Sequence, residues 1–158
     1  MDGKGRDGVE TEAVRLGKEY LRALQAKDKR AILAILADDF VLEVPLNVSG
    51  SNDFSDSWRG LEAAAANYET TFRIIADIIY TEVEITPGLD PHVAVIEGLG
   101  AMTMANGRRY RNRYVFRFES ENGKLRRIRE YANPVTSAIA FGMPLPEASD
   151  DGVAGAFV

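Results

Sequence analysis

The chain of 158 residues contains no cysteine and only one histidine, His92. The absence of cysteine excludes disulfides, thiolate nucleophiles, iron–sulfur clusters and cysteine-ligated zinc sites. One histidine cannot build a histidine-rich metal site, and His92 ends a turn-like stretch of Gly, Leu, Asp and Pro, where an ordinary loop residue is expected. We therefore expect neither a metal nor another cofactor.

The chain also lacks a run of about 18 apolar residues, an apolar signal-peptide core and an excess of basic charge. The first two absences argue against membrane insertion and export, so we expect a cytoplasmic protein. The net charge of -5 disfavours binding to nucleic acids or anionic membranes. Arginine is nevertheless concentrated between Arg108 and Arg129, where it is expected to form the solvated face of a sheet. A nucleic-acid-binding surface is the alternative for these arginines.

Hydrophobic residues make up 46% of the chain, which is enough to bury the core of one domain. The two ends differ from the rest, because residues 1–9 are rich in glycine and charge and residues 147–158 are acidic and rich in glycine and alanine. We expect a mobile N-terminus over 1–9, a single domain over 10–146 and a mobile tail over 147–158.

Hydrophobic periodicity predicts three amphipathic helices before a long run of strands. Thr11 and Asp28 are suitable N-caps for the first two helices, and Pro45 confines an early strand to an edge or an end of the sheet. The order indicates an α+β fold in which a curved, cone-shaped antiparallel sheet wraps around three N-terminal helices. Helices are expected at 11–27, 29–37, 61–76 and about 136–141, and strands at 40–46, 78–86 and 92–104 and in the stretches 108–118 and 125–134.

The last two strands form a hairpin that carries the most specific signal. Strict alternation puts arginines on one face of the first strand and a mostly aromatic set on the other: Tyr110, Asn112, Tyr114, Phe116 and Phe118. In the second strand Glu130 shares a face with Ile128 and Ala132. Burial on an apolar face raises the pKa of a carboxyl, which suits Glu130 for general acid or base catalysis. A structural ion pair with an arginine is the alternative role.

A second carboxylate, Glu97, shares a face with the apolar residues two and four positions away on both sides. Two carboxylates in one apolar cavity push their pKa values apart, leaving one as the acid and the other as the base. We therefore expect Glu97 to assist Glu130, unless its face is the outer face of the sheet and makes a dimer contact.

Aromatic residues on apolar faces supply further candidates for the site. Tyr20 and Tyr114 are expected to donate hydrogen bonds to a developing oxyanion, with plain core packing as the alternative. Trp58 either contacts the ligand or plugs the junction between a loop and the third helix. The other residues expected to contact a ligand are Tyr68, Phe72, Asn112, Phe116 and Ile128.

Several short motifs occur in a characteristic order: Tyr20-Leu21-x-Ala23-Leu24 before Asp28, Leu36-Ala37-Asp38-Asp39-Phe40, Trp58-Arg59-Gly60, Asn122-Gly123-Lys124-Leu125, and Arg129-Glu130-Tyr131-x-Asn133-Pro134 followed by Gly142-Met143-Pro144. Together they resemble the SnoaL-like branch of the nuclear transport factor 2-like superfamily, over about residues 10–146. The last motif is most similar to the phenazine-biosynthesis A/B proteins and to related small isomerases and cyclases of secondary metabolism. The resemblance implies the cone-shaped fold.

Ketosteroid isomerases share this fold, and the resemblance assigns their catalytic positions to three residues here. Their oxyanion-binding tyrosine matches Tyr20, their general-base aspartate matches Val44, and their second acid matches Tyr114. The carboxylate beside Val44, that of Glu43, points to the other face of the strand. One of the three positions is therefore kept and two differ.

In the phenazine-biosynthesis A/B proteins, the resemblance places acidic pocket residues at Glu130 and Glu97. The expected function is that of a small cofactor-independent isomerase or cyclase, which uses carboxylates for acid and base chemistry on a hydrophobic, carbonyl-bearing metabolite. The missing aspartate at Val44 and the lack of a catalytic histidine favour the alternative, a noncatalytic small-molecule-binding or protein-interaction domain of the same fold.

The arginine-bearing face of the sheet is expected to form a homodimer. This face carries Arg113 and Tyr131, and arginine and tyrosine are enriched at interfaces. The family resemblance implies the same pairing of sheet against sheet. Because like charges would meet across a twofold axis, acidic partners are required, and the candidates are Glu82, Glu84 and Glu119.

Overall fold

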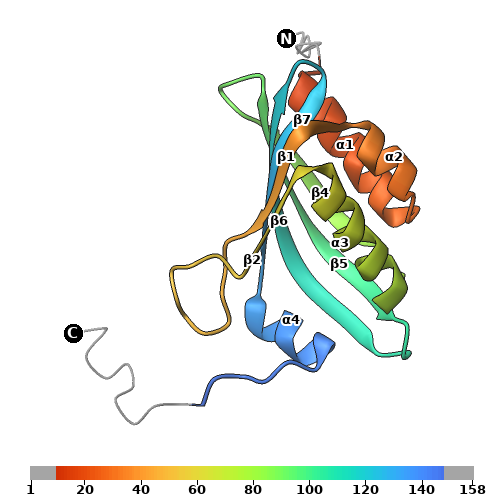
Figure 1. Ribbon diagram of the computed structural model, residues 1–158, viewed down its shortest axis with the longest axis vertical. Coiled ribbons are helices and arrows are strands. Elements are labelled where there is room, and N and C mark those ends of the chain that lie inside the picture. The colour runs from red at the N-terminus through yellow and green to blue at the C-terminus, as the bar shows by residue number, and fades with distance from the viewer. Residues whose placement is uncertain (1–9, 148–158) are drawn as a thin grey trace, which may run out of the picture.

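A computed structural model describes residues 10–147, in which three helices pack along the concave face of a curled sheet (Figure 1). Thr11 and Asp28 cap the first two helices as predicted. Their side chains accept hydrogen bonds from the backbone N–H groups of Val14 at 3.3 Å and Ala31 at 2.9 Å. The helices are α1 (Glu12–Gln25), α2 (Lys29–Ala34) and α3 (Gly60–Ile74).

Seven strands form one sheet in the order β2-β1-β7-β6-β5-β3, and β4 also pairs with β5. The predicted C-terminal hairpin is present and turns at Asn122 and Gly123, both of which have positive φ angles. A fourth helix, α4 (Pro134–Phe141), follows the last strand. The strands are β1 (Leu36–Val44), β2 (Asp56–Arg59), β3 (Ile75–Asp77), β4 (Tyr80–Pro87), β5 (Val93–Met104), β6 (Arg109–Glu121) and β7 (Lys124–Ala132).

The sheet is mixed, whereas the sequence predicted an antiparallel one. Strand β1 runs parallel to β7, with Leu42 opposite Ile128, and antiparallel to β2. It is therefore an interior strand, and Pro45 directly follows its end instead of marking an edge. Helix α2 ends earlier than predicted because β1 already begins at Leu36.

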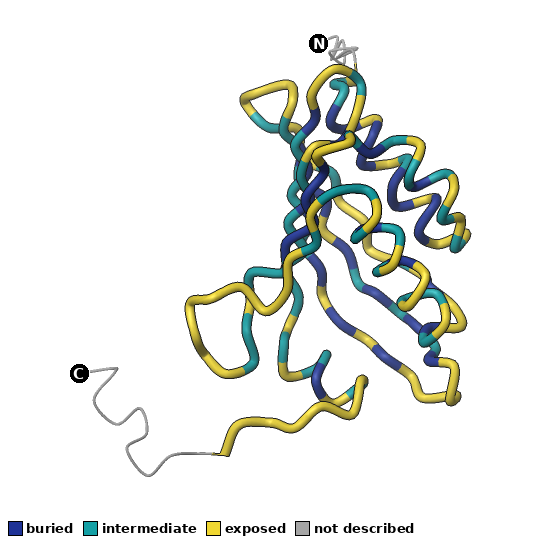
Figure 2. Tube along the Cα trace, in the orientation of Figure 1, coloured by how far each residue is buried: buried dark blue, intermediate teal, exposed yellow. Residues whose placement is uncertain are grey.

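Burial alternates along the long strands and separates a core face from an outer face (Figure 2). Helix α1 comes close to the core face at Gly17, where a Cβ atom would lie 3.1 Å from side-chain atoms of Ile96 and Phe118. Glycine at this position permits the close packing of helix on sheet. The alternation predicted for β6 is confirmed, since its inward residues are all buried: Tyr110, Asn112, Tyr114, Phe116 and Phe118.

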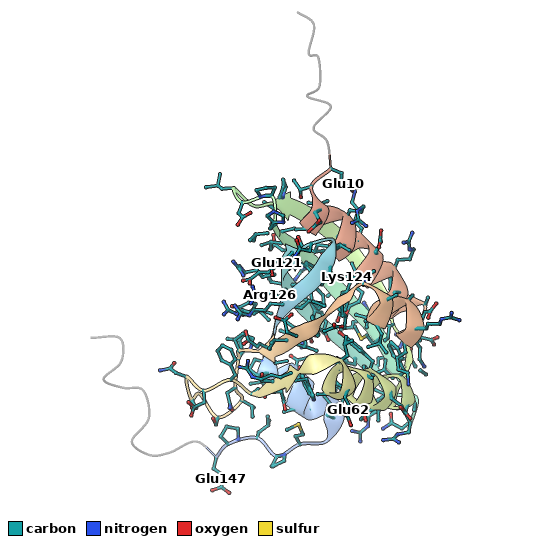
Figure 3. All side chains as sticks on the ribbon, turned by 45° about the horizontal axis from the view of Figure 1, so that its top comes forward. Glu10, Glu62, Glu121, Lys124, Arg126 and Glu147 are labelled. Carbon is teal, nitrogen blue, oxygen red and sulfur yellow. The ribbon has the colours of Figure 1, made fainter. Side chains whose placement is uncertain are left out.

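Charged side chains lie mainly on the outside of the fold. None of the helices within residues 10–147 is both long and apolar enough to cross a membrane. The predicted mobile ends, 1–9 and 147–158, lie outside the described residues except for residue 147. Figure 3 labels six charged residues, all of them exposed: Glu10, Glu62, Glu121, Lys124, Arg126 and Glu147.

Candidate active site

A cavity of about 290 Å³ lies on the concave side of the sheet, and α1, α3 and α4 contribute to its lining. Most of the lining is aliphatic or aromatic, and a small number of polar groups reach into it. This combination is typical of a small-molecule site. Five tyrosines and one glutamate from five different elements line it: Tyr20, Tyr68, Tyr80, Tyr110, Tyr114 and Glu130.

Glu130 lies on the inward face of β7, opposite Phe116 of β6. The neighbouring arginines point to the other face of the sheet, where Arg127 and Arg129 contact Glu43. Among residues 10–147 Glu130 therefore has no ionic partner, and burial raises the pKa of its carboxyl to about 7. Both protonation states are populated near neutral pH, so Glu130 is placed to accept and to return a proton.

Tyr20 of α1 and Tyr68 of α3 meet at the cavity. Their hydroxyl oxygens are 3.0 Å apart, and their rings pack edge to face with centroids 6.2 Å apart. Because one hydroxyl donates to the other, one proton of the pair stays available for a bound oxygen atom. Burial, and then the charges of Tyr68 and Glu130, raise the pKa of Tyr20 well above its usual value, so its hydroxyl keeps its proton.

Tyr80, at the start of β4, lines the cavity although no sequence pattern predicts it there. Its hydroxyl has no hydrogen-bond partner within the described part of the chain. Burial, together with the charge of Glu130, raises the pKa of Tyr80 well above its usual value. Its ring packs edge to face against Tyr114, with centroids 5.5 Å apart. Tyr80 therefore presents an unengaged hydroxyl donor close to the carboxylate.

A bulge in β4 explains why alternation gives no signal for Tyr80. In a regular strand Tyr80 would share a face with Glu82 and Glu84, and both glutamates are exposed. The pairing with β5 shifts register between Thr81 and Glu84, and Glu82 has a positive φ of 51°. The bulge resets the alternation, so Tyr80 faces inward while the glutamates face outward.

Tyr114 lies in the cavity as predicted, but its hydroxyl proton is already engaged. Tyr114 donates to the hydroxyl of Tyr110 at 2.9 Å, which in turn lies 2.9 Å from the Oγ of Ser137 on α4. Ser137 donates to the carbonyl oxygen of Asn133 at 3.2 Å. This chain fixes the direction of each hydroxyl proton, so Tyr114 offers a ligand its lone pairs and no donor.

Asn112 fastens α4 to β6 and does not line the cavity, contrary to the sequence expectation. Its amide nitrogen lies 3.0 Å from the hydroxyl of Tyr110, 3.1 Å from the Oγ of Ser137 and 3.0 Å from the carbonyl oxygen of Asn133. Its side-chain oxygen accepts the backbone N–H of Asn133 at 3.0 Å. Because Asn133 is also the N-cap of α4, Asn112 fixes where that helix begins.

Of the other residues expected to contact a ligand, Trp58 and Tyr68 line the cavity, while Phe72, Phe116 and Ile128 do not. Phe116 and Ile128 face inward as predicted, but both are fully buried in the core. Phe72 packs against the ring of Tyr68, with centroids 6.2 Å apart. Alternation identifies the inward face of a strand, but it does not distinguish the core from the cavity.

Glu97 does not lie in the cavity, because it is exposed on the outer face of β5. It pairs with Val115 of β6 on one side and with Glu84 of β4 on the other. The residues predicted to share a face with Glu97 do so, but that face is the outer one, and the other face of β5 points into the core. Both faces of β5 carry apolar side chains, so alternation predicts which residues share a face but not which face is buried. Glu97 is therefore excluded as a second cavity carboxylate.

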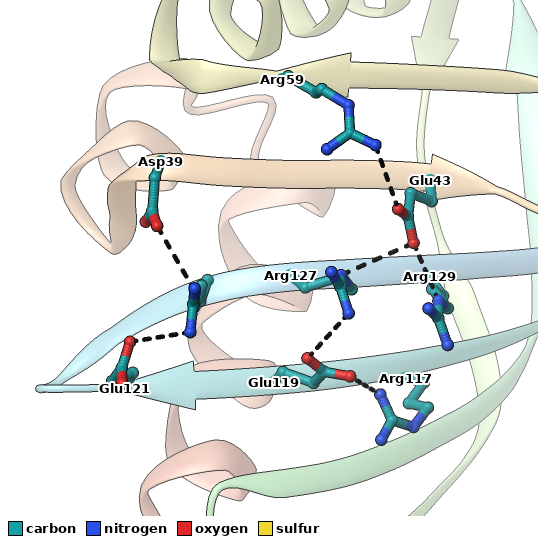
Figure 4. Close-up of polar contacts among 9 residues, drawn as sticks. Asp39, Glu43, Arg59, Arg117, Glu119, Glu121, Arg127 and Arg129 are labelled. Atoms are coloured by element: carbon teal, nitrogen blue, oxygen red, sulfur yellow. Dashed lines mark hydrogen bonds and ion pairs between the residues drawn. The ribbon is translucent and has the colours of Figure 1, made fainter.

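The outer face of β1 and β7 carries an ion-pair cluster centred on Glu43 (Figure 4). This carboxylate is buried and accepts a hydrogen bond from Arg129 at 2.9 Å. It also lies 3.7 Å from Arg127 and 4.0 Å from Arg59. Glu119 lies 3.5 Å from Arg127. Glu43 thus points away from the cavity as expected. The arginines that contact it lie on the outer face of the sheet and form ion pairs there.

Gly100 on β5 leaves space for the ring of Tyr114. A Cβ atom at position 100 would lie 2.6 Å from Cε2 of Tyr114. We expect Gly100→Ala to displace this ring and to lower the free energy of unfolding by about 1–3 kcal/mol, as measured by urea unfolding. Gly98→Ala is the matched control, because its Cβ would meet nothing closer than 3.5 Å. If the two variants lost the same free energy of unfolding, Gly100 would not be required to leave space for the ring of Tyr114.

No three or more His, Cys, Asp or Glu side chains within residues 10–147 are grouped so that they could hold a metal ion. The side chains that line the cavity supply one carboxylate that can gain and lose a proton near neutral pH, hydroxyl donors from Tyr80 and from the Tyr20–Tyr68 pair, and apolar walls.

Comparison with known proteins gives a family model described as a SnoaL-like domain, which matches residues 18–128. Phenazine biosynthesis protein PhzA1 of Pseudomonas aeruginosa is 40% identical over 42 residues. That match covers 27% of this chain and 26% of PhzA1, so it spans about a quarter of the curated relative.

Solved structures share the fold over most of their length. A phenazine biosynthesis-related protein (phzb2) from Pseudomonas aeruginosa has a TM-score of 0.69 at 20% identity, covering 97% of this chain and 96% of that one. A Delta 5-3-ketosteroid isomerase from Mycobacterium sp. has a TM-score of 0.68 at 25% identity, covering 80% and 96%. Candidate polyketide cyclases from Pseudomonas putida and Xanthomonas campestris pv. campestris have the same fold, with TM-scores of 0.67 and 0.66 at 22% identity. With the family model matched over residues 18–128, the chain belongs to the SnoaL-like domain family.

Proposed function

We propose that the protein is a small cofactor-independent isomerase or cyclase that acts on a hydrophobic, carbonyl-bearing metabolite, with Glu130 moving the proton. The observation that carries this proposal is a carboxylate without an ionic partner in an apolar cavity, surrounded by tyrosine hydroxyls. The reaction classes named for the similar structures, which include an isomerase and candidate cyclases, support the same type of chemistry.

In the proposed reaction, ionised Glu130 removes a proton from the carbon next to the carbonyl group. The C–H electron pair forms the C=C bond of an enolate, and the negative charge moves to the carbonyl oxygen. Tyr80 and the free hydroxyl of the Tyr20–Tyr68 pair donate hydrogen bonds to that oxygen. In an isomerisation, Glu130 then returns the proton to a different carbon. In a cyclisation, the enolate carbon attacks a second carbonyl and Glu130 protonates the resulting alkoxide.

This scheme gives Tyr80 the donor role that the sequence assigns to Tyr114. The hydroxyl of Tyr114 already donates to Tyr110, whereas the hydroxyl of Tyr80 is unengaged within the described residues. The assistance expected from Glu97 is absent from the scheme, since that side chain lies on the other side of the sheet. One carboxylate acts first as the base and then as the acid.

Titration of Glu130 tests this proposal directly. Carbon-13 NMR of glutamate-labelled protein should show one carboxyl signal that titrates near pH 7, because burial raises the pKa of Glu130 to about that value. Glu130→Gln should remove this signal and so assign it. A Glu130 signal that titrates near the ordinary value of about 4.3 would contradict the proposal and favour a noncatalytic binding domain.

We also propose that the outer face of the sheet forms a homodimer. Half-buried apolar side chains on this face include Leu99, Val115 and Tyr131. Two of the acidic residues expected to pair across the interface are already paired within the chain, since Glu82 lies 3.1 Å from Arg113 and Glu119 lies 3.5 Å from Arg127. Pairing of this kind lowers the like-charge repulsion between two copies of the face.

Light scattering at micromolar concentration should therefore give about twice the 17.4 kDa mass of one chain. Arg113→Glu is expected to shift the mass toward the monomer, because it removes the partner of Glu82 and places a second negative charge beside it on each copy. Arg30→Glu makes the same charge change at an exposed position of α2 and should leave the mass unchanged. A monomeric unmodified protein would refute the homodimer without affecting the cavity.

A further inference from the structure

The cavity is lined by charged groups of one sign. Apart from tyrosines, the ionisable residues that line it are Glu130 and Asp56, and within residues 10–147 no lysine, arginine or histidine is among the lining residues. Asp56 is exposed at the start of β2, opposite Val44, and so lies at the rim. Glu130 lies inside on β7. A ligand therefore passes the carboxylate of Asp56 when it enters the cavity and faces that of Glu130 once it is bound.

The arginines of the sheet do not compensate for this charge. Arg129 directly precedes Glu130 in the chain, but strand alternation sends it to the outer face. There it donates to Glu43 at 2.9 Å, and Arg127 lies 3.7 Å from the same carboxylate. An anionic group in the cavity would meet like charge and no basic side chain from the lining.

The polar groups that remain for a ligand are neutral. Tyr80 and one hydroxyl of the Tyr20–Tyr68 pair can donate hydrogen bonds, and Asn67 and Thr71 of α3 add neutral polar groups to the lining. Such groups suit the oxygen of a ketone or a phenol. A buried carboxylate, by contrast, needs a cation or several N–H donors to offset its loss of water.

We propose that the cavity takes an uncharged ligand, a planar aromatic ketone or phenol, and rejects the carboxylate of the same shape. This proposal rests on the proposed function, whose substrate class it narrows. Tyrosine rings supply flat apolar walls for such a ligand. The volume of about 290 Å³ lies just below the usual range for small-molecule sites, about 300–1,000 Å³, which favours a small ligand of two or three rings.

Isothermal titration calorimetry of the full chain at pH 8 tests the charge preference with probes of matched shape. The probes are 2-acetylnaphthalene, 2-naphthoate and 2-naphthylmethylammonium, together with the corresponding one-ring and three-ring ketones and carboxylates. The best ketone should bind at least about tenfold more tightly than its carboxylate. Equal binding of the carboxylate, tighter binding of the ammonium compound, or no binding of any ketone would each overturn the proposal.

Three variants test whether charge sets this preference. Asp56→Lys should strengthen 2-naphthoate binding by about tenfold, and the uncharged control Asp56→Asn should change it by less than about threefold. Glu130→Gln should also improve naphthoate binding at pH 8, because it removes the interior carboxylate. If none of these changes occurs, charge is not the cause of the preference.

These outcomes are separate from a failure of the proposed function. If carboxylates bind as well as ketones while Glu130→Gln still abolishes turnover, only the charge preference is refuted. If ketones are preferred but Glu130→Gln turns over normally, only the role of Glu130 in the reaction is refuted.

Discussion

Glu130→Gln is expected to lower kcat/KM by about 10²–10⁴-fold, the range that a positioned general acid or base contributes. The amide has the size and shape of the carboxyl group, but it accepts no proton at neutral pH. The substitution also breaks no ion pair, since Glu130 has no ionic partner among the described residues. Exchange of the ketone's α-hydrogens for deuterium in heavy water, followed by proton NMR, measures the proton-transfer step directly.

Glu97→Gln is the matched control for this experiment. The same atoms change, but on the exposed outer face of β5, so kcat/KM is expected to stay within about twofold. Unchanged exchange in Glu130→Gln would remove Glu130 from the reaction. A large loss in Glu97→Gln would show that the outer face takes part.

The substitution Glu130→Gln is also expected to stabilise the fold by about 3 kcal/mol at pH 8. Burial raises the pKa of Glu130 from 4.5 to about 7, so the folded protein holds this proton more tightly than the unfolded chain does. Below pH 4.5 the carboxyl is protonated in both the folded and the unfolded state, so its burial does not lower the stability of the wild type through ionisation. Between pH 4.5 and 7 the unfolded chain releases the proton first, and the wild type loses stability as the pH rises. Above pH 7 the loss is constant.

Urea unfolding at pH 5 and pH 8 measures this effect. Glutamine does not titrate, so the gain in the free energy of unfolding should be small at pH 5 and reach its full size at pH 8. Glu97→Gln, on the outer face, should give no comparable gain. A gain of the same size at both pH values would mean that it arises from packing and not from the ionisation of Glu130.

The sequence predicts the parts of the fold whose signals are local. Thr11 and Asp28 cap the helices where expected, because a cap depends only on the residues within one turn. The hairpin of β6 and β7 follows from alternation and a short turn. The parallel pairing of β1 with β7 joins distant parts of the chain, so no local sequence pattern predicts this pairing. Strand β2 has only four residues, too few for a periodic signal.

The same distinction holds for the candidate site. Glu130 is found from the sequence because a carboxylate interrupts an otherwise apolar face of β7. Glu97 interrupts an apolar face as well, but both faces of β5 are apolar, and only the packing of the helices decides which of them is inside. The inward direction of Tyr80 depends on a bulge at Glu82, and the residues around Glu82 give no sequence signal for it. Tyr114 is placed correctly, but the direction of its hydrogen bond depends on α4.

The pairing of β1 with β7 also determines when during folding the cavity can exist. Because Leu42 pairs with Ile128, strands from opposite ends of the domain must meet before Glu130 has its neighbours. Contacts between distant parts of a chain tend to form late, since closing a long loop costs entropy before any contact offsets it. A nascent chain whose last strand is still inside the ribosome therefore carries the tyrosines of the site but not its carboxylate. A metabolite that must contact both the tyrosines and the carboxylate therefore cannot stabilise early folding intermediates. It can bind and stabilise only the completely folded domain.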